Sequence, residues 1–214
     1  MREFVLDKGH VTLIDKMGGD LSVVNAARVS FGKKSISMEE REEKLLSYLY
    51  ENGHTSPFRH AFVKLHIKAP IFVMRQWMKH QVGCSWNEKS ARYSKMKNDF
   101  YIPTYWRGKH ESNLQGSSGL IENQDEASAS YILASEQSIT TYNALLGRGV
   151  CREQARMILP ISLYTESVWT ASLQALMHFL RERESNNAQY EIQEYARAVR
   201  RLCSPVFPMC FKLT

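Results

Sequence analysis

The sequence has none of the short motifs that usually hold a phosphate group or expose a nucleophile. Across its 214 residues there is no GxGxxG, no P-loop sequence and no GxSxG. These absences exclude a dinucleotide-binding fingerprint, a P-loop site and the nucleophile elbow of an α/β hydrolase. Any phosphorylated ligand must therefore be held by residues outside these motifs.

Cysteine is scarce and apolar runs are short. Cys84, Cys151, Cys203 and Cys210 have no CxxC spacing, which indicates a reducing compartment rather than a disulfide framework. The histidines include no HExxH pair, so no metal site is predicted. The longest apolar run, residues 69–74, is far shorter than the roughly 20 residues of a membrane-spanning helix. Because the start, MREFVLDKGH, is also unlike a secretory signal, we expect a soluble cytoplasmic protein without a membrane partner.

No long linker divides the chain, so residues 1–214 are predicted to form a single domain. A hydrophobic share of 43% is enough for one well-buried core. The polar segment 108–119 is expected to be a surface loop within this domain. The net charge of +6 fits a solvated basic surface, nucleic-acid binding or a site for several phosphorylated small molecules, and composition alone does not choose among them.

Alternating patterns predict strands. Residues 3–6 and 10–17 alternate on either side of a Lys-Gly break, which predicts a hairpin. Residues 60–69 have the clearest pattern, with every second residue apolar between Ala61 and Ile67. Further candidate strands are residues 100–102 and 163–169.

Apolar residues at helical spacing predict several helices. Ser37 and Glu40 have the spacing of a capping box, and Pro70 is expected to be the first residue of its helix. The strongest periodicity runs from Ala188 to Leu202. Asp20 or Ser22 is predicted to cap a first helix that ends near residue 29. The other predicted helices cover residues 38–52, 70–79, 129–146, 151–158, 172–181 and 188–202. Since the elements do not alternate as βαβ units, the fold class is α+β.

One polar segment has the composition of a ligand site. Residues 75–93, RQWMKHQVGCSWNEKSARY, combine cations with amides, hydroxyls and a histidine. Burying such a group without a partner costs on the order of 1–3 kcal/mol. An exposed helix end followed by a polar turn would also explain them, but it would not normally need Trp77, Trp86 and Tyr93. Aromatic rings beside fixed donors suit a heteroaromatic ring that carries a phosphate.

The end of this segment, NEKSARYS from Asn87, resembles the signature Asn-Glu-x-Ser-x-Arg-Tyr-Ser of the flavin-dependent thymidylate synthases. The family has Arg-His-Arg, where this chain has Lys79-His80-Gln81. In the family seven residues separate this tripeptide from the serine, whereas here eight residues separate Gln81 from Ser90. Lys79 keeps the positive charge but loses the bidentate fork of arginine, and Gln81 loses the charge. The resemblance continues, in order along the chain, in LSVVNAARVSFGK, GHTSPFRH, APIFVMRQW, REQARMILP and AQYEIQEYA.

The resemblance implies a fold, an activity and partners. The fold would be a single α+β domain with a mixed or antiparallel sheet packed against long helices. The enzyme would convert dUMP to dTMP with 5,10-methylenetetrahydrofolate as the methylene donor. FAD would carry the hydride from NADPH, and no cysteine nucleophile would be needed. The family is homotetrameric with shared active sites, which would assign the positive charge to anionic ligands.

The resemblance also implies roles for individual residues. Arg183 would be the catalytic residue, because a fixed cation beside N3 and the carbonyls stabilises negative charge in the uracil ring, by about 3–4 kcal/mol. Loop amides, the Ser90 hydroxyl and Arg92 would hold the phosphate. The residues implied for dUMP are Gln76, Trp77, Lys79, Glu88, Lys89, Ser90, Ala91, Arg92, Arg156 and Arg183. The residues implied for FAD are His54, Ser56, Lys79, His80, Gln81, Glu88, Ser172, Gln174 and His178.

Other interpretations remain open. Lys79 and Gln81 would also suit an enzyme that keeps the scaffold but acts on another pyrimidine nucleotide. Cys84 lies near the motif, but no base is paired with it, which disfavours a thiolate nucleophile. A nucleic-acid-binding module is disfavoured because the cations are interleaved with glutamates, and we expect no nucleic-acid partner. Each residue also has a purely structural interpretation. The Ser90 hydroxyl could hydrogen-bond to its own turn, and the arginines 156 and 183 could be solvated or form ion pairs. The histidines 54 and 80 could cap a helix or lie in the core.

Overall fold

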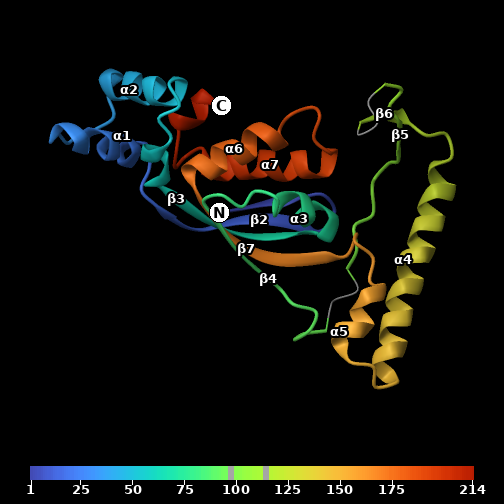
Figure 1. The fold of residues 1–214 in the computed structure, drawn as a ribbon. Helices are drawn as coiled ribbons and strands as arrows, with labels where there is room; N and C mark the ends of the chain where they lie inside the picture. The colour runs from blue at the N-terminus through green and yellow to red at the C-terminus, as the bar shows by residue number, and fades with distance from the viewer. Residues whose placement is uncertain (96–98, 113–115) are drawn as a thin grey trace.

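A computed structural model describes residues 1–95, 99–112 and 116–214 of the chain. Its centre is a five-stranded antiparallel sheet in the order β1-β2-β3-β7-β4 (Figure 1). The strands are β1 (Arg2–Val5), β2 (Gly9–Met17), β3 (Phe62–Pro70), β4 (Cys84–Glu88) and β7 (Tyr164–Ser172). The structure thereby confirms the α+β class and the antiparallel sheet.

One face of this sheet is covered by helices. In Figure 1, α6 and α7 lie across it, with α1 and α2 beyond one end. Alternate residues of β3, namely Val63, Leu65 and Ile67, point into the core and have almost no exposed surface. The helices of this layer are α1 (Asp20–Arg28), α2 (Glu40–Glu51), α6 (Leu173–Arg183) and α7 (Tyr190–Cys203).

An aromatic cluster fills the core where the short helix α3 (Ile71–Trp77) meets α6. The Trp77 ring stacks on Phe179 with 4.6 Å between ring centroids and meets Trp169 edge-on at 5.4 Å. Trp86 of β4 in turn stacks on Trp169 at 5.4 Å. These contacts fix the position of α3 and of the polar residues that follow it.

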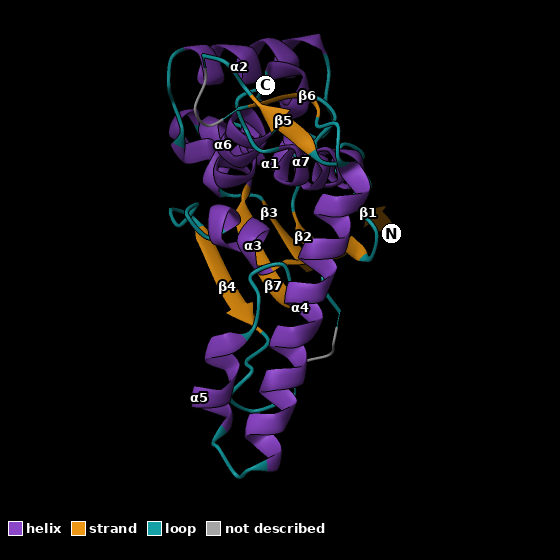
Figure 2. Cartoon of the chain, turned by 90° about the vertical axis from the view of Figure 1, so that its right-hand side faces the viewer, coloured by secondary structure: helices purple, strands orange, loops and turns teal. Residues whose placement is uncertain are grey.

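A helical arm extends from the edge of the sheet. The long helix α4 (Gln124–Gly147) runs beside the sheet and leads into α5 (Arg152–Ala155), as Figures 1 and 2 both show. A 3₁₀ turn, η3 (Arg156–Ile158), follows directly. A small two-stranded sheet of β5 (Arg107–Lys109) and β6 (Ser117–Leu120) lies at the other end of α4. None of the helices in the described ranges is both long and apolar enough to cross a bilayer.

The predicted hairpin, the central strand and all seven helical regions are present, but several details differ. Asp20 is the first residue of α1 rather than its cap, and its carboxylate accepts hydrogen bonds from the amides of Met209 (2.8 Å) and Cys210 (3.1 Å). Ser37 and Glu40 form no capping box, because α2 begins at Glu40 and the Ser37 hydroxyl donates to Glu39 instead (3.0 Å). The Asp20 carboxylate thus binds the C-terminal segment, far away in the sequence, instead of capping α1.

Three segments differ more strongly. The predicted surface loop at 108–119 contributes to the β5–β6 hairpin, with residues 113–115 outside the described ranges. The predicted strand at 100–102 is only a single bridge from Phe100 to Leu163. Residues 84–88, which have no alternating pattern, form β4, because their backbone groups pair with β7 at the edge of the sheet.

Candidate active site

The end of α6 brings a guanidinium group onto the residues that follow α3. Nε of Arg183 donates to Nε2 of His80 (3.0 Å), and Nη2 donates to the backbone carbonyl of Gln76 (3.3 Å). Arg183 is half-buried, so its remaining N–H groups can face a ligand. The structure therefore brings three of the residues predicted for the site, Arg183, His80 and Gln76, into direct contact.

His80 is held as a neutral imidazole. Burial, followed by the positive charge of Arg183 and the neighbouring His178, lowers its pKa from the usual 6.5 to about 4. Because Nε2 accepts from Arg183, the ring proton must be on Nδ1. In the described part of the chain, this buried Nδ1 has no hydrogen-bond partner. An unpaired buried donor is a position that a bound molecule or an adjoining chain can satisfy.

A cavity of about 460 Å³ adjoins this cluster. His54, Gln174 and His178 line it, and the His178 ring lies 5.3 Å from the His80 ring. The side-chain oxygen of Gln174 accepts from Nε of Arg59 (2.5 Å). The volume is typical of ligand pockets, which span about 300–1,000 Å³. Its amide and imidazole groups are of the kind that could hold one portion of a flavin dinucleotide, which is what the family resemblance implies for His54, Gln174 and His178.

Two predicted contacts are corrected by burial. The Trp77 side chain has no exposed surface and belongs to the aromatic core, so it supports the site from behind rather than touching dUMP. Ser172 is 2% exposed and is the N-cap of α6, where its hydroxyl accepts from the amide of Ala175 (3.3 Å). In this structure that hydroxyl serves the fold as a helix cap.

The remaining predicted FAD residues lie on the surface around the cluster. Lys79 and Gln81 flank His80 and are exposed. Ser56 is exposed at the start of the 3₁₀ turn η2 (Ser56–Arg59), although it is not among the residues that line the 460 Å³ cavity.

The loop predicted to bind phosphate lies at the far end of β4. The Lys89 amide donates to the Glu166 carbonyl (2.8 Å), which anchors the loop where β7 begins. Beyond it, the Ser90 hydroxyl accepts from the Arg92 amide (3.3 Å), so it stabilises the turn in this structure. Arg92 forms an exposed ion pair with Glu153 of α5 (3.4 Å). Glu88 is the last residue of β4, and Ala91 belongs to the loop that follows. Arg156 follows α5 in η3 and is exposed.

One chain does not bring all the predicted residues into a single cavity. Arg183 contacts the residues after α3, whereas Arg92 contacts α5, and Figure 1 shows α5 well away from α6. The five residues of β4 separate the two groups along the chain, and a strand rises about 3.3 Å per residue. Within one chain, Arg183 and Arg92 therefore belong to two separate groups of predicted residues.

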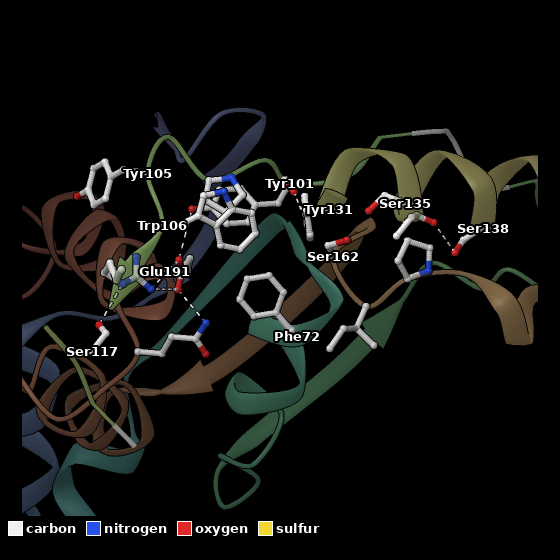
Figure 3. A pocket seen from close by; sticks show the side chains of 16 residues that line it. Phe72, Tyr101, Tyr105, Trp106, Ser117, Tyr131, Ser135, Ser138, Ser162 and Glu191 are labelled. Atoms are coloured by element: carbon white, nitrogen blue, oxygen red, sulfur yellow. Dashed lines mark hydrogen bonds and ion pairs between the residues drawn. The ribbon is translucent and has the colours of Figure 1, made fainter. Parts of the chain in front are cut away.

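A separate cavity contains none of the residues predicted for the site from the sequence. It has a volume of about 640 Å³ and lies between α3, α4 and the β5–β6 hairpin (Figure 3). Phe72, Tyr101 and Trp106 give it an aromatic wall, and Glu191 provides a buried carboxylate paired with Arg107 (3.0 Å). Burial, together with Glu191, raises the pKa of the Tyr101 hydroxyl, which therefore remains protonated. The sequence did contain a signal for this wall, because Glu191 lies in the segment AQYEIQEYA.

Cys84 is a poor candidate for a nucleophile. It lies in β4, and burial raises the pKa of its thiol, which disfavours the reactive thiolate at neutral pH. Within the described ranges, no three His, Cys, Asp or Glu residues are grouped so that they could hold a metal ion.

Known proteins with similar sequences identify the family. The profile of the thymidylate synthase complementing protein family matches residues 12–209. A flavin-dependent thymidylate synthase of Kosmotoga olearia is 44% identical over 211 residues, which are 97% of this chain and 90% of that protein. One from Thermus thermophilus is also 44% identical, over 97% of this chain and 76% of its own length. The chain belongs to the flavin-dependent thymidylate synthase family.

Solved structures agree with this assignment. The UMP/dUMP methylase PolB from Streptomyces cacaoi, bound to 5-Br dUMP, superposes with a TM-score of 0.88 at 30% identity, over 99% of this chain and 96% of that chain. Its complex with 5-Br UMP gives a TM-score of 0.84 at 30% identity, over 98% and 94% of the two chains. The fold, the flavin dependence and the methyltransferase activity predicted from the sequence are those of the flavin-dependent thymidylate synthases.

Proposed function

We propose that this chain methylates C5 of dUMP to give dTMP, with 5,10-methylenetetrahydrofolate as the methylene donor, NADPH as the reductant and FAD as the bound cofactor. The observation that carries the proposal is the contact of Arg183 with both His80 and Gln76 beside a cavity lined by His54 and His178. It joins a fixed cation for a pyrimidine ring to a pocket suited to a flavin.

In this proposal, bound FAD supplies the hydride chemistry of the reaction. The chain's own residues would hold it: His54, Gln174 and His178 line the cavity and His80 adjoins it. Ser56, Lys79 and Gln81 would contribute from exposed surface, and Glu88 from the far end of β4. Lys79 and Glu88 would serve the cofactor and the nucleotide together, since the family places both beside the two ligands.

Arg183 activates the pyrimidine. Its free N–H groups stabilise negative charge on the uracil carbonyls, which raises electron density at C5, and such a preorganised contact is worth about 3–4 kcal/mol. His80 contributes by accepting from Nε, so that the guanidinium keeps one orientation before substrate arrives. A protonated His80 would repel Arg183, and the lowered pKa prevents this at neutral pH.

The phosphate of dUMP is proposed to be bound by a neighbouring chain. Arg92 and Arg156 are exposed and Lys89 and Ser90 are half-buried, and this group lies near α5, away from Arg183 of the same chain. Apolar side chains on the same arm are also exposed, including Met157 (79%) and Ile161 (61%). Exposed apolar surface of this kind favours association, so we propose a homotetramer in which each site combines residues from several chains. Its location in the cytoplasm remains a prediction from the sequence.

UMP is a second candidate substrate. PolB, with which this chain superposes, is described as a UMP/dUMP methylase. The two nucleotides differ only in the 2′-hydroxyl group, so turnover of both under identical conditions would separate a strict thymidylate synthase from a broader methylase.

The proposal is tested with purified protein and added FAD. We expect a yellow protein that releases tritium from C5-labelled dUMP only when methylenetetrahydrofolate and NADPH are both present. A colourless protein that added FAD does not convert to a flavoprotein would contradict the proposal. A flavoprotein that turns over UMP but not dUMP would show that the substrate is UMP, with the proposed methylation chemistry unchanged.

A further inference from the structure

The segment AQYEIQEYA contributes two side chains to a chain of hydrogen bonds that ends at Gln76. Nε2 of Gln76 donates to Oε1 of Gln189 (2.6 Å), and Nε2 of Gln189 donates to Oε2 of Glu191 (2.8 Å). The Glu191 carboxylate also accepts from Nη2 of Arg107 at both oxygens (3.0 and 3.1 Å) and from the Tyr101 hydroxyl (3.3 Å). Figure 3 shows Glu191 and Tyr101 at the wall of the large cavity.

The donors and acceptors in this series of hydrogen bonds can be arranged in only one order. Glu191, which is 3% exposed, forms an ion pair with Arg107, and the carboxylate of such a pair can only accept hydrogen bonds. Gln189 must therefore turn its NH₂ group toward Glu191 and its oxygen toward Gln76. Gln76 must in turn point its NH₂ group at Gln189, which leaves its own oxygen, Oε1, for the site.

We propose that Glu191 and Gln189 are positioning residues that fix Gln76 as a hydrogen-bond acceptor for the nucleotide. The inference rests on the function proposed above. The acceptor recognises a donor of the nucleotide, either the N3–H of the uracil ring or a hydroxyl of the sugar. A Gln76 side chain turned over would present N–H to that donor, which removes the hydrogen bond and adds a repulsive contact.

Two features of the fold support this role. The backbone carbonyl of Gln76 accepts from Arg183, so the acceptor oxygen lies beside the guanidinium proposed to bind uracil. Gln189 occupies the N-cap of α7, yet its side chain accepts no capping hydrogen bond. Helix caps are usually Ser, Thr, Asp or Asn. Here the Gln189 side chain instead links Glu191 to Gln76, and we call this series of hydrogen bonds, Glu191–Gln189–Gln76, the relay.

The relay is tested in the FAD-loaded enzyme with Gln189→Leu and Glu191→Gln. Gln189 is exposed, so its replacement leaves the core and the Glu191–Arg107 pair in place. Glu191→Gln can donate as well as accept, which frees the relay to reverse. Tyr101→Phe is the matched control, because it removes a hydrogen bond from the same carboxylate without interrupting the path to Gln76. Thermal unfolding of each variant checks the fold.

We expect Gln189→Leu and Glu191→Gln to raise the KM and the Kd for dUMP roughly tenfold or more with kcat little changed, and Tyr101→Phe to leave all three near wild type. Isothermal titration with N3-methyl-dUMP and with 2′,3′-dideoxyuridine monophosphate identifies the donor. The analogue that lacks it binds the wild type more weakly than dUMP does, and this penalty shrinks in both relay variants.

Relay variants that bind dUMP and both analogues as the wild type does would overturn the inference while leaving the proposed function intact. An equal rise in KM for Tyr101→Phe would also overturn it, since the effect would then come from disturbing the carboxylate in general. A wild-type flavoprotein that binds no dUMP would overturn the proposed function together with the relay.

Discussion

His80 accepts a hydrogen bond from Nε of Arg183 across 3.0 Å, although the two residues lie 103 positions apart in the chain. The contact joins the segment after α3 to the end of α6. It requires a neutral imidazole and leaves the other guanidinium N–H groups of Arg183 available. The charge of His80 and the orientation of Arg183 therefore depend on each other.

The protonation of His80 makes stability depend on pH. Its pKa of about 4 in the folded protein lies below the ordinary value of 6.5. As the pH falls from about 6.5 to about 4, the unfolded chain takes up a proton at this residue and the folded chain does not, so the free energy of unfolding decreases. His80→Gln keeps an acceptor for Arg183 but does not titrate, so it should flatten this part of the profile.

Urea unfolding between pH 4.5 and 6.5 measures the effect. His60→Gln, which replaces an exposed histidine, is the control and should keep the wild-type slope. Equal slopes for the wild type and His80→Gln would show that His80 is not buried as a neutral ring.

Arg183→Lys tests the geometry of the guanidinium rather than its charge. Lysine cannot donate to His80 and Gln76 together while facing a ligand, because it lacks the planar fork. We expect kcat for dTMP formation to fall by about 10²–10³-fold, the usual effect of losing one preorganised donor. Arg201→Lys, at a surface ion pair with Glu3, should leave kcat unchanged. An Arg183→Lys enzyme with near-normal kcat would mean that charge alone suffices.

Ser172 and Gln174 should separate stability from cofactor binding. Ser172→Ala removes the N-cap of α6 and should lower the free energy of unfolding by about 1 kcal/mol without changing FAD affinity. Gln174→Leu, two residues further on, removes an amide from the cavity wall and should weaken FAD binding. Denaturant titration and flavin fluorescence measure the two effects. Loss of FAD from Ser172→Ala at unchanged stability would restore Ser172 as a ligand.

Cys84→Ala should retain activity. The thiol is partly buried and its pKa is raised, so it does not provide a thiolate for the pyrimidine ring. Initial rates of dTMP formation should lie within about twofold of wild type, since no bonding step is removed. A loss of several orders of magnitude with the fold intact would instead identify a covalent mechanism.

Periodic burial explains which elements the sequence predicts. In β3 and α7 the apolar residues recur at the spacing that faces the core, so the sequence predicts that Leu65 and Val199 are buried. β4 gives no such signal, because it is an edge strand whose residues Ser85 and Asn87 are exposed and whose hydrogen bonds come from the backbone. Edge pairing of this kind depends on the partner strand, which local sequence does not describe.

The sequence singles out candidate residues for the site but does not give their geometry. Trp77 has polar neighbours in the sequence, which predicts a ligand contact. In the structure its ring packs on Phe179 of α6, about a hundred residues further along the chain. The relay from Gln76 to Gln189 spans 113 positions and requires the fold to bring α3 and α7 together. The separation of Arg183 from Arg92 likewise depends on the length and direction of β4.

The claim that each site combines two chains is tested most directly by mixing two inactive variants. Arg183→Ala and Arg156→Ala should each abolish dTMP formation as homotetramers. If Arg183 comes from one chain and Arg156 from another, an equal mixture refolded together will contain sites with both arginines intact, and activity should return to about a quarter of wild type for random assembly. A refolded mixture that remains as inactive as its components would place both arginines in the same chain and contradict the shared site.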